Sequence, residues 1–244
     1  MGFLNLESLL NILFSMKIAL LGYGRMGKEI EKIALQRGHT IVIKSNSDST
    51  YTISDADVAI DFSVPNSAVN NISNCINNQI PVISGTTGWL ENYDKMVDFC
   101  NEKKGAFLYA SNFSLGVNIF FELNNQLAKM MNSLSDYNIA MEEIHHTKKI
   151  DAPSGTAITL AEGIIENSSK TTWELGRKKS EETIPITSKR IGDVPGTHIV
   201  NYDSDVDAIE IKHTAHNRKG FALGAVVAAE WILNKKGVFT MKDV

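Results

Sequence analysis

The sequence has little cysteine and no excess of positive charge. Its two cysteines, Cys75 and Cys100, have no metal-ligand spacing and fall in segments with a helical pattern. Buried, reduced thiols are therefore favoured over a disulfide, which fits a cytoplasmic protein. The net charge of −4 is opposite in sign to the basic field that nucleic-acid-binding proteins usually present. A disulfide-stabilised secreted domain and a nucleic-acid binder are both disfavoured.

The apolar N-terminal stretch, residues 1–15, is too short to span a bilayer and is interrupted by Glu7. It also lacks the basic start and the small-residue cleavage site of a signal peptide. Because Met16 opens a strand-like segment, as an initiator methionine would, we expect residues 1–15 to be an extension outside the fold. No membrane association is predicted.

A regular alternation of strand-like and helix-like segments runs from Lys17 to about residue 114. Such alternation is typical of a parallel sheet with helices on both faces. The pattern then changes, and residues 184–214 alternate polar and apolar positions as antiparallel strands do. A helix-like segment rich in small residues, 220–233, follows. The sequence predicts an α/β domain of residues 16–114 and 219–244, with an inserted α+β domain of residues 115–218 on a mainly antiparallel sheet.

The segment GYGRMG, residues 22–27, has the spacing G-x-G-x-x-G between a strand and a helix. In this pattern Gly22 allows a tight turn, Gly24 lets the backbone approach a pyrophosphate, and Gly27 lets the helix pack closely on the strand. The helix N-terminus adds N–H groups and a positive dipole end. Glycines also form plain turns, but the strand–turn–helix context favours dinucleotide binding. The first domain is therefore predicted to be of the Rossmann type.

The acidic residue that often binds the ribose 2′-hydroxyl of NAD has no clear counterpart. Lys44, Asn46 and Asp48 stand at the distance of about 20 residues where it is expected. Without a fixed carboxylate a 2′-phosphate is not repelled, so NADH and NADPH both stay open. A solvated turn is an equally good interpretation of each of these residues.

Two more loops follow strands, SGTTGW at 84–89 and ASNFS at 110–114. Because open α/β sheets bind ligands at the carboxyl ends of their strands, we expect both loops to border the nicotinamide half of the cofactor. Either loop taken singly is also compatible with an ordinary turn.

The segment EEIHHTKKIDAPSGTA, residues 142–157, combines carboxylates, histidines, lysines and a Pro-Ser-Gly-Thr turn. Consecutive histidines on a strand point to opposite faces and rarely chelate one ion, so no metal site is predicted. Ser154 is interpreted as a helix N-cap and Lys148 as a solvated lysine. Glu142 and Glu143 are interpreted as structural carboxylates at a strand end.

Together with GRMG, IDFSVP, ISGTTGW and ASNFSLGVN, the segment HHTKKIDAPSGTA resembles the 4-hydroxy-tetrahydrodipicolinate reductase family. The match runs in order from about Lys17 to the C-terminus. It implies an NADH- or NADPH-dependent reductase of the diaminopimelate and lysine pathway, with a homotetramer built through the second domain's sheet. It implies proton transfer by His145 and Lys149 and substrate-carboxylate binding by His146, Gly155 and Thr156. The implied cofactor contacts are Gly22, Tyr23, Gly24, Arg25, Met26, Gly27, Gly85, Thr86, Thr87, Ala110, Ser111, Asn112 and Phe113.

The chemistry of these residue types agrees with a small dicarboxylate substrate. The Gly155–Thr156 backbone at a helix N-terminus offers N–H donors, and Lys149 adds positive charge. Hydride addition to a conjugated C=C–C=N system builds negative charge that a nearby acid, His145 or Lys149, must neutralise. Two alternatives stay open: a dinucleotide-binding sensor without catalysis, and a dehydrogenase of similar fold acting on a sugar, an amino acid or another small carboxylate.

Overall fold

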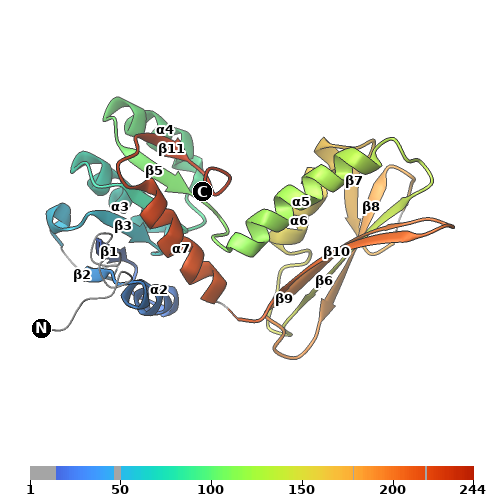
Figure 1. The fold of residues 1–244 in the computed structure, drawn as a ribbon, viewed down its shortest axis with the longest axis horizontal. Coiled ribbons are helices and arrows are strands. Elements are labelled where there is room, and N and C mark those ends of the chain that lie inside the picture. The colour runs from blue at the N-terminus through green and yellow to red at the C-terminus, as the bar shows by residue number, and fades with distance from the viewer. Residues whose placement is uncertain (1–14, 47–50, 178, 218) are drawn as a thin grey trace, which may run out of the picture. The chain divides into compact units, whose positions relative to one another are not determined.

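The computed structural model describes residues 15–46, 51–177, 179–217 and 219–244 (Figure 1). The chain divides into two compact units. Unit 1 comprises Met1–Leu115 and Lys219–Val244, and unit 2 comprises Gly116–Arg218. Unit 1 contains a parallel sheet and unit 2 a second, mixed sheet, so the predicted fold class is confirmed. The predicted extension, apart from Ser15, lies outside the described residues.

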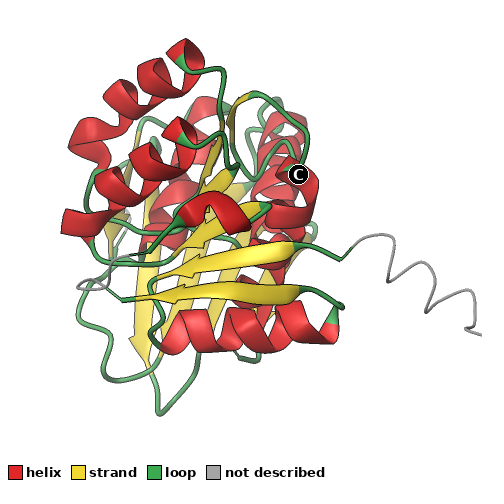
Figure 2. Cartoon of the chain, turned by 90° about the vertical axis from the view of Figure 1, so that its left-hand side faces the viewer, coloured by secondary structure: helices red, strands yellow, loops and turns green. Residues whose placement is uncertain are grey.

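Unit 1 is built on a six-stranded sheet in which every pairing is parallel. Figure 2 shows neighbouring strands of this sheet pointing in the same direction. Its central strands are short apolar runs with almost every residue buried, as expected when helices cover both faces. In spatial order the strands are β11 (Gly237–Phe239), β5 (Ala106–Tyr109), β4 (Val82–Ser84), β3 (Val58–Asp61), β1 (Lys17–Leu21) and β2 (Thr40–Ser45).

Helices cover the two faces of this sheet in pairs. Ile18 and Leu20 of β1 pack in a core with α2 (Arg25–Gln36) and α7 (Lys219–Ile232). Figure 1 shows α7 beside α2. Ala19 and Leu21 point the other way, into a core with α3 (Pro65–Asn77) and α4 (Tyr93–Glu102). Two short 3-10 helices, η1 (Ile53–Asp55) and η2 (Leu90–Asn92), complete the unit.

Both cysteines lie in the second of these cores. Cys75 and Cys100 are buried and free, as predicted. Burial raises the pKa of each thiol, which keeps both protonated and unreactive at neutral pH.

Unit 2 is built on a five-stranded sheet that is mixed. β6 pairs antiparallel with β9, and β9 with β10, as the sequence predicts for this region. β8 instead pairs in parallel with β6 and β7. The chain returns through a helix between β6 and β7 and through a loop between β7 and β8, so the three strands run in the same direction. In spatial order the strands are β10 (Ala208–Ala215), β9 (Gly196–Asp203), β6 (Asn138–His145), β8 (Thr183–Arg190) and β7 (Thr172–Leu175).

Two helices, α5 (Leu115–Met131) and α6 (Gly155–Glu166), cover one face of this sheet. Ile139 and Met141 of β6 are buried against them, whereas Ala140 is exposed and Glu142 half-buried on the opposite face. In the described part of the chain no helix is long and apolar enough to cross a membrane.

Candidate active site

The glycine loop after β1 has the geometry of a phosphate cradle. Gly22 has a φ of 98°, and a Cβ there would come within 2.1 Å of the Phe62 carbonyl oxygen. A Cβ on Gly27 would lie 2.5 Å from the Gly22 oxygen, so the helix sits directly against the turn. A Cβ on Gly24 would meet nothing within 4 Å, and Gly24 caps α2 without a side chain. The open side of this loop, with the first N–H groups of α2, fits a pyrophosphate.

The end of β2 carries a cluster of three side chains. The Lys44 ammonium lies 2.6 Å from the Glu31 carboxylate of α2 and 5.1 Å from the centre of the Tyr23 ring. The Tyr23 hydroxyl also donates to Glu31. The hydrogen bonds from Lys44 and Tyr23 hold the pKa of Glu31 below its usual value. Asn46 is exposed, and Asp48 lies outside the described residues.

A fully buried carboxylate, Asp61 at the end of β3, organises the next two loops. Its oxygens accept hydrogen bonds from four side chains at 2.7–2.9 Å. Burial raises the pKa of Asp61, and these donors oppose that effect. Because the donors come from α3 and from the ends of β3 and β4, Asp61 fixes both loops relative to each other. The donors are Ser63, Asn71, Ser84 and Thr86.

The predicted cofactor contacts in these loops differ in exposure. Thr86 is buried, and its carbonyl oxygen accepts a hydrogen bond from the Trp89 indole at 2.7 Å, whereas Thr87 is exposed. A Cβ on Gly85 would lie 2.4 Å from the Phe62 ring. The same ring packs on Phe113 of the 110–114 loop at 5.5 Å between centroids. Phe62 therefore joins the two loops that the sequence predicts to border the nicotinamide.

Replacing Asp61 by asparagine should weaken cofactor binding. The amide offers one acceptor oxygen in place of two and places N–H groups against buried donors, a cost of about 1–3 kcal/mol in stability. We expect a lower denaturation midpoint and roughly tenfold weaker NADH binding, measured by urea denaturation and fluorescence titration. Asp57→Asn is the matched control, because exposed Asp57 accepts only the Lys17 N–H among described contacts. Equal effects of the two variants would contradict the assigned role.

In unit 2 the turn that opens α6 at residues 154–156 (the anion turn) has the geometry of an anion-binding site. Ser154 is the N-cap of α6, as predicted, and its hydroxyl oxygen accepts from the Ala157 N–H at 3.2 Å. The Ser154 N–H donates to Glu143 at 3.0 Å. Of the first backbone donors of the helix, those of Gly155 and Thr156 have no partner among the residues that the structure describes. No atom lies within 4 Å of where a Cβ on Gly155 would stand. Two N–H groups beside open space can bind a carboxylate.

His145 ends β6 on the helix-covered face, beside Glu143. The side chain is 10% exposed, and its Nδ1 lies 3.5 Å from the Glu143 carboxylate. Glu143 is fully buried and also accepts from Ser188 at 2.8 Å and Arg190 at 3.0 Å. Burial lowers the pKa of His145, and Glu143 opposes the shift. Burial alone would raise the pKa of Glu143, but its hydrogen bonds outweigh burial and hold the pKa low.

Lys149 occupies the loop between β6 and α6. Its ammonium donates to both carboxylate oxygens of Asp151 at 2.8 Å, and the Lys149 side chain is 21% exposed. Arg190 donates to the Asp151 carbonyl oxygen at 2.6 Å and thereby ties this loop to β8. Lys148 is exposed, as expected of a solvated lysine.

Hydrogen bonds and ion pairs thus connect His145, Lys149 and the Gly155–Thr156 turn through Glu143, Asp151 and Arg190. His146 follows the strand, and its buried Nδ1 has no hydrogen-bond partner among the described residues. From the sequence, Glu143 is predicted only as a structural carboxylate, and no site role is predicted for Arg190, Ser188 or His198. Glu143, His145 and His198 each offer one metal-ligand type of atom, and these atoms lie within 4.8 Å of one another, a grouping not predicted from the sequence.

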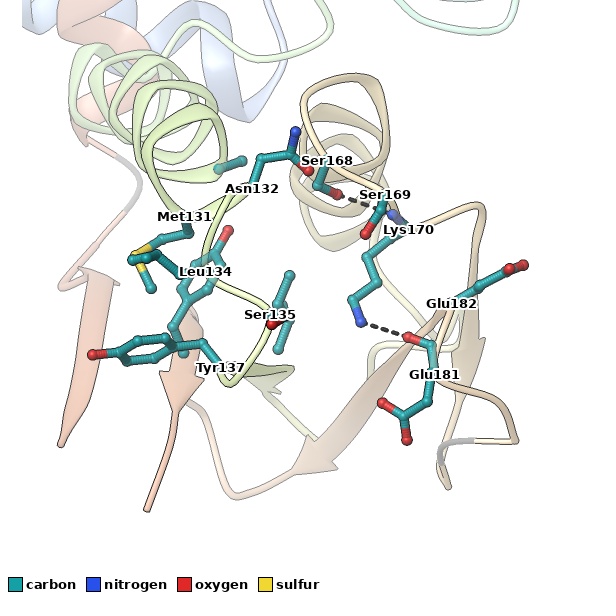
Figure 3. Close-up of a pocket in the computed structure, with 13 residues that line it drawn as sticks. Met131, Asn132, Leu134, Ser135, Tyr137, Ser168, Ser169, Lys170, Glu181 and Glu182 are labelled. Atoms are coloured by element: carbon teal, nitrogen blue, oxygen red, sulfur yellow. Dashed lines mark hydrogen bonds between the residues drawn. The ribbon is translucent and has the colours of Figure 1, made fainter. Parts of the chain in front are cut away.

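A separate pocket of about 410 Å³ lies elsewhere in unit 2 (Figure 3). Its walls include Met131, Tyr137, Ile139 and Lys170. None of the predicted site residues lines it, and Ile139 stands near the opposite end of β6 from His145. The chemistry-bearing residues are therefore not in this pocket.

Family models match nearly the whole described chain. The model for the N-terminus of dihydrodipicolinate reductase matches residues 16–113, and that for its C-terminus matches residues 116–244. A 4-hydroxy-tetrahydrodipicolinate reductase from Christiangramia forsetii is 58% identical over 233 residues, which is 94% of this chain and 97% of that relative. The corresponding enzyme from Thermosipho africanus is 36% identical over 231 residues, with the same coverage of 94% and 97%.

A solved structure has the same fold. It is that of dipicolinate-bound dihydrodipicolinate reductase from Paenisporosarcina sp. TG-14, and it matches with a TM-score of 0.77. The two chains are 19% identical, and the match covers 94% of this chain and 99% of the other. The fold agrees over nearly the full length of both chains.

Proposed function

The chain belongs to the dihydrodipicolinate reductase family, and we propose that it reduces 4-hydroxy-tetrahydrodipicolinate to tetrahydrodipicolinate with NADH or NADPH. This reaction lies in diaminopimelate and lysine biosynthesis, and the family predicted from the sequence is confirmed. In the structure, one observation supports the reaction best: a single buried carboxylate, Glu143, contacts both the imidazole of His145 and the anion turn at Ser154.

Binding of the substrate is assigned to the loop 146–156 and the start of α6. One carboxylate accepts from the Gly155 and Thr156 N–H groups at the positive end of the helix dipole. The Lys149 ammonium supplies positive charge for the dianion, and His146 can add a hydrogen bond. Asp151, which pairs with Lys149, keeps the ammonium in place in the absence of substrate.

Loss of water from the hydroxylated ring leaves a conjugated C=C–C=N system. When bound, a reduced nicotinamide supplies a hydride to one end of this system. His145 or Lys149 then gives a proton to the other end, so that tetrahydrodipicolinate, oxidised cofactor and water result. Because burial lowers the pKa of His145, the free enzyme holds it neutral, and the charge of the bound dianion favours uptake of the proton it donates.

Oxidation of NADH and NADPH with enzymatically generated 4-hydroxy-tetrahydrodipicolinate tests the proposal. We expect oxidation that depends on this substrate and is inhibited by dipicolinate, the molecule bound to the reductase from Paenisporosarcina sp. TG-14. A sensor would bind the cofactor and oxidise none. A dehydrogenase of similar fold would act on sugars or amino acids and be indifferent to this dicarboxylate.

Both nicotinamide cofactors should be used with less than about a thousandfold discrimination, or about 4 kcal/mol. Glu31→Gln should raise the ratio of kcat/KM for NADPH to that for NADH by roughly fivefold, because it releases the Lys44 ammonium for a 2′-phosphate. Glu29→Gln, which breaks only the pair with Lys32 on the same helix, is the control. An unchanged ratio in Glu31→Gln would show that Lys44 takes no part in cofactor choice.

We also propose that the chain forms a cytoplasmic homotetramer through the face of the unit 2 sheet opposite α5 and α6. Among the residues that the structure describes in unit 2, no helix covers this face, and association of chains would remove it from water. Sedimentation at the mass of four chains is expected, and a monomer at all concentrations would refute it.

A further inference from the structure

We propose that Glu143 is a positioning residue that orients the imidazole of His145 and, together with Ser154, couples it to the anion turn. The inference rests on the proposed function and deepens it, since Glu143 acts through His145 rather than on the substrate. From the sequence, this residue is predicted only to be a structural carboxylate.

Glu143 is fixed from three directions. Ser188 and Arg190 of β8 donate to one oxygen, Oε1, at 2.8 and 3.0 Å. The Ser154 N–H at the start of α6 donates to the other, Oε2, at 3.0 Å. With 0% of its side chain exposed, the carboxylate has no freedom to follow the imidazole, so the imidazole must adjust to it.

The fixed carboxylate determines which nitrogen of the His145 imidazole is left for proton transfer. Oε2 of Glu143 lies 3.5 Å from Nδ1, a buried atom with no hydrogen bond among the described residues. A small rotation brings the two into hydrogen-bond distance, which places a proton on Nδ1, so that Nε2 is the nitrogen that takes up and then donates the second proton. A Cβ on Gly196 would lie 3.1 Å from Nε2, so the glycine leaves room beside the donating nitrogen.

His198 completes the arrangement without adding charge. Its ring meets that of His145 edge-on at 5.0 Å between centroids, and its Nε2 lies 3.1 Å from the Ser154 hydroxyl. Burial, followed by the neighbouring His145, lowers the pKa of His198 to about 4. The neutral imidazole of His198 therefore contacts both the His145 ring and the N-cap of α6, and it fixes their positions relative to each other.

The charge of Glu143 should have a measurable effect on the pKa of His145. Burial lowers the pKa of His145 most, and the cations Lys149 and Arg190 lower it further. Glu143 and Asp151 raise it, and Glu143 is the larger of the two influences. Removing the Glu143 charge must therefore move the pKa of His145 downward, and the protonated fraction at neutral pH must fall.

A resident metal ion fits the same residues less well. Glu143, His145 and His198 include the ligand types that zinc uses. Both oxygens of Glu143 already accept hydrogen bonds, however, and the Arg190 guanidinium lies 3.0 Å from one of them. A cation would have to displace these donors, so positioning is favoured over metal binding.

The test is the pH dependence of kcat for Glu143→Gln. In the wild type, kcat should fall as rising pH removes the proton from His145. In the variant this decline should begin about one pH unit lower, so kcat near neutral pH should drop roughly tenfold and recover in part on acidification. Glu143→Asp, which keeps the charge, should retain the wild-type position of the decline. NADH affinity should be unchanged in both.

Glu142→Gln is the matched control, because Glu142 stands on the opposite face of β6 and pairs with Lys189. Its pH profile should equal that of the wild type. A Glu143→Gln profile lowered equally at every pH would show a merely structural role and overturn the proposal. So would loss of wild-type activity on chelation with recovery on adding zinc, which would establish a metal site.

Histidine NMR titration of the full-length protein without substrate gives a readout independent of the reaction. The His145 resonance, assigned by its loss in His145→Gln, should titrate at lower pH in Glu143→Gln than in the wild type. An unchanged midpoint would overturn the inference even if the reductase activity holds. A lowered midpoint with no activity toward the dicarboxylate would instead refute the proposed function alone.

Discussion

Lys149→Ala is expected to lower kcat at least about a hundredfold and to raise KM for the dicarboxylate. A general acid typically contributes ~10²–10⁴ in rate, and a charge-assisted contact contributes about 1.5–3 kcal/mol. Loss of the ammonium also removes the cation that pairs with the Asp151 carboxylate. The negative charge of Asp151 then repels the dianionic substrate. NADH affinity, assigned to the glycine loop of unit 1, should change little. Steady-state kinetics and NADH titration measure both effects.

The neighbouring lysine is the matched control for this prediction. Lys148 is exposed, and Lys148→Ala should leave kcat and KM nearly unchanged. His145→Ala should resemble Lys149→Ala in kcat. Near-normal kcat in Lys149→Ala would contradict the assignment of residues 145–149 to proton transfer.

Gly224→Ala is expected to destabilise unit 1 by about 3 kcal/mol, with weaker NADH binding. A Cβ at this position would stand 1.6 Å from the carbonyl oxygen of Phe113, where backbone meets backbone. Either α7 or the 110–113 loop must move, and that loop is an assigned cofactor contact. Urea denaturation and fluorescence titration with NADH report the two consequences.

Gly220→Ala, on the same helix, provides the comparison. A Cβ there would lie 3.6 Å from the Ser114 hydroxyl, an ordinary contact. Alanine also has the better helix propensity, so stability should stay within about 1 kcal/mol of the wild type. If Gly224→Ala were equally harmless, it would contradict the close packing of α7 on the 110–113 loop.

Residues that belong to local motifs could be predicted from the sequence. The spacing of GYGRMG predicts a separate role for each of its three glycines, and the structure shows a steric reason for Gly22 and Gly27, whereas a Cβ on Gly24 would face open space. Ser154 could likewise be assigned as an N-cap, because capping depends on residues within one turn. The parallel sheet follows from strand and helix alternation, which is also a local pattern.

Residues that act through distant partners could not be found in this way. Arg190 reaches Glu143 across 47 positions, and His198 reaches Ser154 across 44. Glu31 stands on α2, away from the end of β2 where the acid was expected, yet it pairs with Lys44. Asp61 lies in an apolar strand, and its four hydrogen-bond donors come together only when α3 and β4 pack around β3. The sequence distance between such partners carries no local signal.

Transfer of deuterium from NADH labelled at the C4 hydrogen tests the central claim most directly. The labelled cofactor is oxidised by the wild-type protein in the presence of enzymatically generated 4-hydroxy-tetrahydrodipicolinate, and the product is analysed by mass spectrometry. When the C4 hydrogen that is transferred as hydride carries the label, we expect one deuterium in tetrahydrodipicolinate for each NADH oxidised. Oxidation of NADH with an unlabelled product, or binding of NADH without oxidation, would contradict it.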